Sequence, residues 1–199
     1  INEPQVEMDP IVRAALVHYQ FETAHPFLDG NGRLGRLLIT LMLINDGVLH
    51  SCLFYPSFQF KKNRSEYYRQ LTSVRERGTY EEWIEFFCNS LLESAKDSVG
   101  SLKNLVDLHN RSTATITENL GRTAANGQRL LGILEEHPIV DTAFIAAQLD
   151  IGRSTASSLV KSFEELGILR PLDESRQRYR QYGYEEYLSI LREDAEPIR

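Results

Sequence analysis

Hydrophobic residues recur at helical spacing through most of the chain. The first such segment begins at Asp9-Pro10, where a carboxylate can cap a helix and proline occupies a position that needs no N–H. It ends at His25-Pro26, because the residue before a proline avoids the α conformation. Apolar residues occupy nearly every face between these two points, which predicts a buried helix.

A second helix is predicted from the glycine-rich stretch after Leu28 to about Asn45, where Asp46-Gly47 is a stop signal. Its leucines leave no polar face, so we expect it to be the central helix of a helical core. Further helices are predicted over 63–77, over 80–98 with Thr79 and Glu82 as a capping box, and from 102 to 110 and beyond. Before residue 120 a strand signal occurs at 52–55.

After Gly121 the pattern changes to shorter elements. Helices are predicted up to His137-Pro138, from Asp141 as cap to 149, and from Ser154 as cap to Gly167. Two strand-like runs, 168–169 and 179–182, flank a polar turn at 173–175 and suggest a hairpin, and a last helix covers 184–192. This order is typical of a winged helix-turn-helix. We therefore expect a mainly α protein with two domains, 1–115 and 116–199.

Composition excludes several classes of protein. The chain has 199 residues, of which 42% are hydrophobic and 25% charged, as in folded globular domains and unlike disordered chains. The net charge of −6 is spread evenly, with 12 basic and 15 acidic residues up to position 120 and 10 and 13 after it. Neither part therefore has the positive field that draws a protein onto nucleic acid.

Cysteine content and apolar runs indicate the compartment. Cys52 and Cys88 are too few for a disulfide framework, and no secretory signal is recognisable. The longest apolar run, 37–44, is too short to cross a bilayer. We therefore expect a reduced, cytoplasmic protein with no membrane partner. Because the sequence begins with Ile1 rather than Met, we also expect it to be a fragment of a longer chain.

Residues 25–36 carry the candidate chemistry and read H-P-F-L-D-G-N-G-R-L-G-R. A glycine-rich loop that leads into a helix N-terminus presents free N–H groups and the positive end of the helix dipole, which together bind anions. Arg33 and Arg36 share one face of the first turn, where the dipole disfavours cations, so they indicate binding of a nucleoside triphosphate. Asp29 beside a phosphate implies an intervening Mg²⁺. His25 is placed to accept a proton from a hydroxyl group.

Each of these residues also has a structural explanation. A histidine before proline often ends a helix, Asp29-Gly30 is a common turn, and paired arginines often face solvent. Phe27 is better explained as a packing residue than as a catalytic one. Only the coincidence of these residues favours a site. Gly30, Gly32 and Gly35 also match a dinucleotide-binding pattern, but that pattern needs a preceding strand, and here a helix precedes it.

The segment 25–36 resembles the signature of the Fic family, H-x-F-x-[D/E]-G-N-G-R-x-x-R, at every fixed position. The resemblance extends to Asn63-Arg64-Ser65-Glu66-Tyr67-Tyr68, Trp83 and Phe86-Phe87, and covers about residues 9–98. Many members carry a winged-helix tail of this kind. The resemblance therefore implies a Fic-type helical core followed by a small winged helix-turn-helix domain.

The resemblance also implies an activity, the transfer of AMP from ATP to a hydroxyl side chain of a target protein. His25 would then be the base, and Asp29 would hold Mg²⁺. The nucleotide would be bound by Gly30, Asn31, Gly32, Arg33, Gly35, Arg36, Tyr67 and Tyr68. For the two tyrosines, packing of an amphipathic helix is an equally good explanation. The family's target-aligning flap and its inhibitory helix would precede Ile1.

Other functions remain open at this stage. Doc toxins, a branch of the family, transfer the γ-phosphate, but their loop lacks the first glycine that Gly30 supplies here. Removal of AMP is neither favoured nor excluded. A DNA-binding regulator is suggested by Arg170, Arg176, Arg178 and Arg180, and opposed by Glu164 and Glu165 on the expected recognition helix. We therefore expect the tail to make protein contacts rather than to bind DNA, with a second copy of this chain as one candidate partner.

Overall fold

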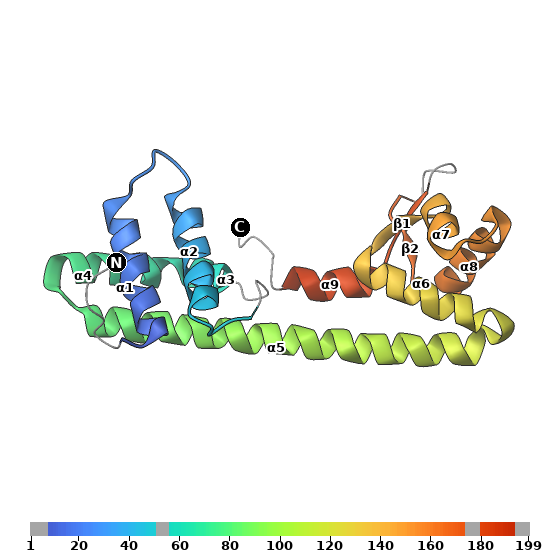
Figure 1. Cartoon of the computed structure of the whole chain (residues 1–199), viewed down its shortest axis with the longest axis horizontal. Helices are drawn as coiled ribbons and strands as arrows, with labels where there is room; N and C mark the ends of the chain where they lie inside the picture. Colours follow the sequence, from blue (N-terminus) through green and yellow to red (C-terminus); the bar gives the residue numbers. More distant parts are fainter. Residues whose placement is uncertain (1–7, 51–55, 174–179, 194–199) are drawn as a thin grey trace. The chain divides into compact units, whose positions relative to one another are not determined.

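The computed structural model describes residues 8–50, 56–173 and 180–193. Its elements are, in order, α1 (Pro10–Ala24), α2 (Asn31–Asn45), α3 (Ser57–Lys62), α4 (Arg64–Arg77), α5 (Tyr80–Asn119), η1 (Gly121–Thr123), α6 (Ala124–Glu136), β1 (Ile139–Asp141), α7 (Thr142–Leu149), α8 (Arg153–Glu165), β2 (Arg170–Pro171), β3 (Gln181–Gly183) and α9 (Glu185–Glu193) (Figure 1). The chain is thus mainly α. Its contacts define two units, one up to Val99 and one from Gly100.

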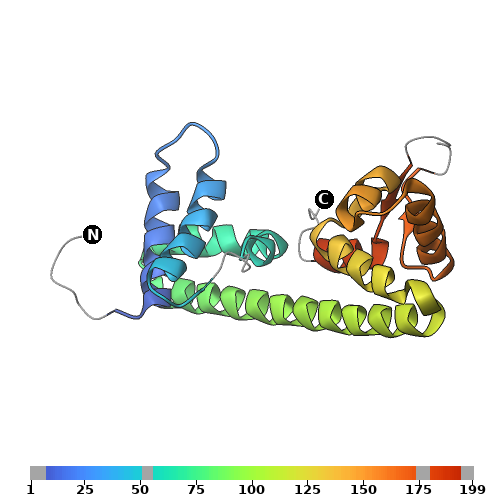
Figure 2. The ribbon, with the colours of Figure 1, turned by 45° about the vertical axis from the view of Figure 1, so that its right-hand side comes forward.

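Helices α1 and α2 lie side by side in the first unit and are joined by the loop 25–30 (Figure 2). The expected start of α1 is confirmed: the Asp9 carboxylate accepts the N–H groups of Ile11, at 2.8 Å, and Val12, at 3.3 Å. At the other end of the pair, Asp46 follows α2 and forms an ion pair with Arg13 of α1. Hydrogen bonding from Arg13 holds the pKa of the Asp46 carboxyl below its usual range. The pair is therefore fixed at the end opposite the loop.

Helix α2 is less buried than its sequence predicts. Leu34, Leu37 and Leu41 are between 42% and 52% exposed, so one face of the helix is not covered by the described residues. The opposite face is buried through Gly35, Ile39 and other small or apolar residues that meet α1. The expected central helix of the core is therefore covered on one face only by the described residues.

Aromatic residues form the core of the first unit. Trp83 of α5 is fully buried, and its indole N–H donates to the Ala15 carbonyl of α1 at 3.0 Å. Phe60 of α3, Tyr67 of α4 and Phe87 of α5 have their ring centroids within 6.0 Å of the Trp83 ring or of one another. The core therefore ties together α1, α3, α4 and α5, and α3 is an element that the sequence did not predict.

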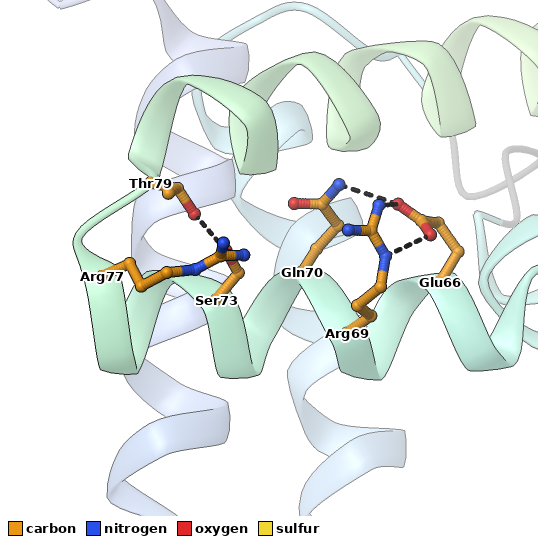
Figure 3. A network of polar contacts seen from close by, with 6 residues as sticks. All are labelled: Glu66, Arg69, Gln70, Ser73, Arg77 and Thr79. Carbon is orange, nitrogen blue, oxygen red and sulfur yellow. Dashed lines mark hydrogen bonds and ion pairs between the residues drawn. The ribbon is translucent and has the colours of Figure 1, made fainter.

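The turn from α4 to α5 is held by polar contacts (Figure 3). The hydroxyls of Ser73 and Thr79 lie 2.6 Å apart, and Arg77 donates to Ser73 at 2.7 Å. Thr79 was expected to cap α5 with Glu82; α5 does begin one residue later, but the Thr79 hydroxyl is engaged by α4. Along the same helix, Arg69 and Gln70 both donate to the Glu66 carboxylate.

Helix α5 is a single helix of 40 residues rather than the two separate segments expected. Its first half supplies core residues to the first unit, and Leu108 and Ile116 belong to the core of the second unit. The domain boundary expected at 115/116 thus falls inside α5, and residues 100–115 group with the second unit.

The second unit is a helical cluster with a small antiparallel sheet in the order β1-β3-β2. Val140 of β1 faces Tyr182 of β3, and Pro171 of β2 faces the same residue from the other side. The core between helices and sheet is mainly aliphatic, with Leu130 and Ile145 fully buried, and it also contains the fully buried ring of Phe163. Asp141 caps α7 as expected, since its carboxylate accepts the Phe144 N–H at 2.7 Å.

Several expectations for the second unit need correction. Helix α8 begins at Arg153 with Gly152 in the capping position, so Ser154 lies inside the helix and is not its cap. The strands lie at 170–171 and 181–183 rather than at 168–169 and 179–182, and β1 was not predicted. The expected turn beyond Asp173, with Arg176 and Arg178, and the strand signal at 52–55 with Cys52, lie outside the described residues. Of the helices in the described ranges, none is both long enough and apolar enough to span a membrane.

Candidate active site

The loop between α1 and α2 places His25 at its start. Its N–H bonds the Phe21 carbonyl at 3.0 Å and so ends α1. The sequence predicts this end through Pro26, but the conformation of His25 is not the extended one expected, since its φ of 44° and ψ of 55° are left-handed. Non-glycine residues seldom adopt this conformation, which persists where surrounding contacts impose it and often occurs at functional sites. The His25 side chain is exposed.

Asn31 fixes the shape of this loop. Its side-chain oxygen accepts the Phe27 N–H at 2.9 Å, and its amide donates to the Phe27 carbonyl at 2.5 Å. The residue is only 2% exposed. Because both ends of the amide are used in this way, the Asn31 side chain is a loop clamp in this structure, and what it can offer a ligand is its backbone N–H. Phe27 itself is 52% exposed, with its ring 6.4 Å from that of Phe21.

The N-terminus of α2 presents free backbone N–H groups to the loop. Gly30 occupies the capping position with φ of 82°, a conformation that a residue with a side chain adopts only at a cost. The first helical hydrogen bond runs from the Leu34 N–H to the Gly30 carbonyl at 3.0 Å. The N–H groups of Asn31, Gly32 and Arg33 therefore have no partner within the helix. They point toward the loop, where the helix dipole favours negative charge.

Both arginines of the motif turn back toward this end. A Cβ placed on Gly32 would lie 3.1 Å from a guanidinium nitrogen of Arg36, and one on Gly30 would lie 3.7 Å from a guanidinium nitrogen of Arg33. This direction follows from helix geometry, because side chains lean over the turn that precedes them. Two positive groups thus lie beside the free N–H groups at the N-terminus of the helix, although the helix dipole disfavours cations there. Such an arrangement is expected for a site that holds a highly charged anion.

Asp29 is the carboxylate nearest to this end in sequence. One of its oxygens accepts the Gly30 N–H at 2.6 Å, and the other lies 3.7 Å from Arg33. Its side chain is 95% exposed, so it has room for further ligands. No cluster of three or more His, Cys, Asp or Glu suited to a metal occurs among the residues that the structure describes. Mg²⁺ held by one carboxylate and the oxygens of a bound phosphate requires no such cluster.

The two tyrosines differ in accessibility. Tyr67 is 4% exposed, and its hydroxyl lies 3.0 Å from Nε2 of His18 in the core. This burial favours the packing explanation and argues against contact with a nucleotide. Burial also raises the pKa of the Tyr67 hydroxyl. Tyr68 is 53% exposed, with the Arg64 guanidinium 5.7 Å from its ring centre, so it remains accessible to a ligand.

His18 is a buried histidine directly behind the motif, and the sequence analysis missed it. Its Nδ1 lies 3.0 Å from the Gly35 carbonyl, which can only accept, so Nδ1 carries the proton and Nε2 accepts from Tyr67. Burial lowers the pKa of His18 from 6.5 to about 4, so the side chain is neutral at pH 7. Its position within the predicted buried helix, seven residues before His25, was the available signal.

Gly35 lies on the buried side of α2, where it meets α1. A Cβ at this position would come within 2.4 Å of Oε1 of Glu22 and 3.2 Å of the His18 ring. Close packing thus explains why this position of the motif is a glycine. Glu22, which was not predicted as a site residue, contacts the motif here. Burial raises the pKa of the Glu22 carboxyl, while the positive charges of Arg36 and His25 act in the opposite direction.

The family comparison agrees with this geometry. Residues 2–43 match the sequence model of the Fic/DOC family. This part of the chain is thus similar to the Fic/DOC family. The Fic/DOC match includes α1, the loop and most of α2, and therefore every residue of the 25–36 motif.

Curated relatives match a longer part of this chain. Protein adenylyltransferase fic-1 of Caenorhabditis briggsae is 34% identical over 102 residues, which is 51% of this chain and 19% of the relative. The Caenorhabditis elegans protein of the same name is 33% identical over 53% of this chain and 20% of the relative. Protein adenylyltransferase Fic of Drosophila ananassae is 35% identical over 44% of this chain and 16% of the relative. The chain thus spans about a fifth of the length of these relatives.

A solved structure is similar over more of the chain. The crystal structure of a Fic family protein from Desulfovibrio desulfuricans G20 covers 90% of this chain and 50% of its own, with 22% identity and a TM-score of 0.47. Similarity at this level carries no argument about the site.

Proposed function

We propose that this chain transfers AMP from ATP to a hydroxyl side chain of a target protein. The observation that carries the proposal is the convergence at the start of α2, where free backbone N–H groups and the guanidinium groups of Arg33 and Arg36 share one end of the helix. His25 lies at the opposite end of the same short loop. The adenylyltransferase names of the relatives support the choice of reaction.

The proposed reaction is a displacement at the α-phosphorus of ATP. His25 accepts the proton of the target hydroxyl while the hydroxyl oxygen bonds to phosphorus. The bond from phosphorus to the oxygen that bridges the α- and β-phosphates breaks, and pyrophosphate leaves with the electron pair. Negative charge therefore grows on the β- and γ-phosphates, where Arg33, Arg36 and the N–H groups of α2 stabilise it. A positioned base contributes roughly 10²–10⁴-fold to such a reaction.

Asp29 is the residue that would hold Mg²⁺ in this proposal. Its exposed carboxylate and the adjacent phosphate-binding end fit the ordinary Mg²⁺ environment of one carboxylate, phosphate oxygens and water. The cation would neutralise charge on the phosphates. Asp29→Ala should therefore abolish turnover at ordinary Mg²⁺ concentrations, and full activity of that variant would contradict the assignment.

Two forms of labelled ATP test the reaction itself. The protein is incubated with its candidate targets and ATP labelled either on the α- or on the γ-phosphate. Adenylyl transfer puts only the α-label on protein. Transfer of the γ-label would instead show phosphorylation, the reaction of the Doc branch, and failure of both labels to reach protein would leave the family fold without the proposed activity.

For the second unit we propose a winged helix-turn-helix that contacts proteins. The element order helix, strand, helix, helix, strand, strand supports this fold. A second copy of this chain is one candidate partner, which the oligomeric state in solution tests, and a regulatory role through DNA is the alternative. We also propose a cytoplasmic location, which the low cysteine content supports.

A further inference from the structure

Glu22 is a carboxylate that the proposed reaction does not use. It lies on the last turn of α1, three residues before His25. Its Oε1 is buried, and it has no hydrogen-bond partner among the residues that the structure describes. A buried oxygen without a hydrogen-bond partner is uncommon in folded proteins. It loses its hydrogen bonds to water on folding, and no new hydrogen bond offsets the cost in free energy. Such an atom at the edge of a site calls for a functional explanation.

The surroundings of Glu22 point to Arg36. Oε1 lies against Gly35, so close that an added Cβ would be 2.4 Å away, and Arg36 is the next residue of α2. The Arg36 guanidinium extends back over Gly32, at 3.1 Å from the position of a Cβ there, which is the phosphate-binding end of the helix. Arg36 is also the strongest of the positive charges that favour the ionised form of Glu22 and so oppose the rise that burial causes in its pKa.

We propose that Glu22 is a positioning residue for Arg36: its carboxylate, which forms no ion pair with Arg36 among the described residues, attracts the guanidinium by charge and keeps it at the proposed phosphate end of α2. Gly35 lacks a side chain because the carboxylate needs that space. This inference rests on the proposed binding of ATP. A guanidinium has five donors, so it can face a carboxylate on one edge and phosphate oxygens on the other. The arrangement reduces the freedom that Arg36 must lose when ATP binds.

A double-mutant cycle on nucleotide affinity tests this role. Arg36→Ala should weaken ATP binding roughly ten- to a hundredfold, as for loss of a charged hydrogen-bonding contact, and weaken AMP binding little. Glu22→Gln keeps the shape of the side chain and removes its charge. It should weaken ATP binding by about three- to tenfold, ADP binding less and AMP binding not at all. In the Arg36→Ala background, Glu22→Gln should have no further effect.

Two further variants separate positioning from general damage. Glu81→Gln makes the same charge change on an exposed residue of α5 in the same unit and should leave ATP affinity unchanged. Gly35→Ala pushes the Glu22 carboxylate away without deleting it, so it should mimic Glu22→Gln toward ATP. In a Glu22→Ala background no carboxylate remains to displace, so any remaining effect of Gly35→Ala measures the contact of the added methyl group with the His18 ring, 3.2 Å away. Thermal unfolding of each variant shows whether it is folded.

The outcomes distinguish this inference from the function on which it rests. If Arg36→Ala leaves ATP affinity unchanged, the phosphate site itself is wrong, and the role of Glu22 fails with it. If Arg36→Ala weakens ATP binding but Glu22→Gln acts equally on ATP and AMP, or acts additively with Arg36→Ala, the phosphate site stands and the positioning role of Glu22 is overturned.

Discussion

The two units of the molecule bury different kinds of residue. Within the described ranges, the first unit buries His18, Asn31, Thr40, Gln59, Gln70, Ser73, Ser90 and Ser94, whereas the second unit buries only Ser112 among its polar side chains. The core of the second unit consists of leucine, isoleucine and valine with a few rings, and that of the first is rich in aromatic residues around a histidine.

This difference shows in which unit buried polar groups restrict the positions of neighbouring residues. A buried polar group costs free energy unless it is hydrogen-bonded, so each one constrains its neighbours to a narrow set of positions. In the first unit two of these groups support the motif: Asn31, a motif residue, shapes the loop, and His18 connects α2 to Tyr67 of α4. In the described part of the second unit the core is mainly apolar, and its buried polar contacts are fewer; the hydroxyls of Ser112 and Tyr184, 2.7 Å apart, form one of them.

The largest effect is expected from His25→Ala, which removes the proposed base from the first unit. Its rate of AMP transfer should fall by roughly 10²–10⁴-fold, because a positioned base contributes about this factor. ATP affinity should change little, since His25 faces the target hydroxyl rather than the phosphates. Single-turnover transfer of α-label measures the rate. His109→Ala, an exposed histidine of the second unit bonded to Glu135 at 2.7 Å, is the matched control and should retain full activity.

Lowering the pH should reduce the unfolding free energy of the first unit through protonation of His18. A folded pKa of about 4, below the ordinary 6.5, means that His18 contributes stability that is fully present above pH 6.5 and is lost as the pH falls toward 4. The difference corresponds to about 3 kcal/mol. Trp83, the single tryptophan, is fully buried in this unit, so its fluorescence during urea unfolding measures the change there.

A variant isolates this histidine from other titrating groups. The Glu22 carboxyl, whose pKa burial raises, becomes more stabilising as the pH falls and so works against the trend. His18→Gln cannot titrate, and the difference between the pH profiles of the two proteins is therefore due to His18. If the unfolding free energies of both proteins fell in parallel between pH 6.5 and 4, the buried neutral histidine would not be the cause.

Asn31→Ala tests the loop clamp. It removes two hydrogen bonds to Phe27 in a residue that is 2% exposed, and should cost the first unit roughly 1–3 kcal/mol of unfolding free energy. ATP binding should weaken as well, because the loop that aims the N–H groups of α2 loses its fixed shape. Asn110→Ala, on an exposed position of α5 in the second unit, deletes the same amide. Equal losses for the two variants in Trp83-detected unfolding would contradict the role of Asn31.

Local signals in the sequence predicted most helices and the loop of the site. Asp9 and Asp141 cap helices where expected, because a cap depends on residues within one turn. The prediction of separate helices at 80–98 and from 102 was wrong, because α5 continues through Gly100, and a long packed helix tolerates a single glycine at about 1 kcal/mol. Strand β1 was missed because its three residues are defined only by pairing with β3, more than forty residues later.

The interior of the site depended on contacts that no local pattern reveals. The motif gave His25, Asp29, Arg33 and Arg36 as candidates, and the structure brings their loop and helix end together. That Tyr67 is buried against His18, and that Glu22 reaches Gly35, follows from how α1, α2 and α4 pack. Residue type and spacing alone do not determine such packing.

The smallest effect is expected when DNA is offered to the second unit. On α8, Lys161 lies 3.7 Å from Glu165, so the helix that would enter a groove carries a paired cation and an acidic last turn. Arg153 is exposed at its start, and Arg170 is exposed on β2, but the acidic residues of the unit outnumber these cations. We therefore expect no sequence-specific binding to duplex DNA at physiological salt. Fluorescence anisotropy of labelled duplexes over a salt series measures it. Phosphate contacts by Arg170, Arg176, Arg178 and Arg180 would give a log–log salt slope of about −3 to −4. A footprint on one defined sequence that disappears with Arg178→Ala and Arg180→Ala would contradict this prediction and show that the second unit binds DNA with sequence specificity.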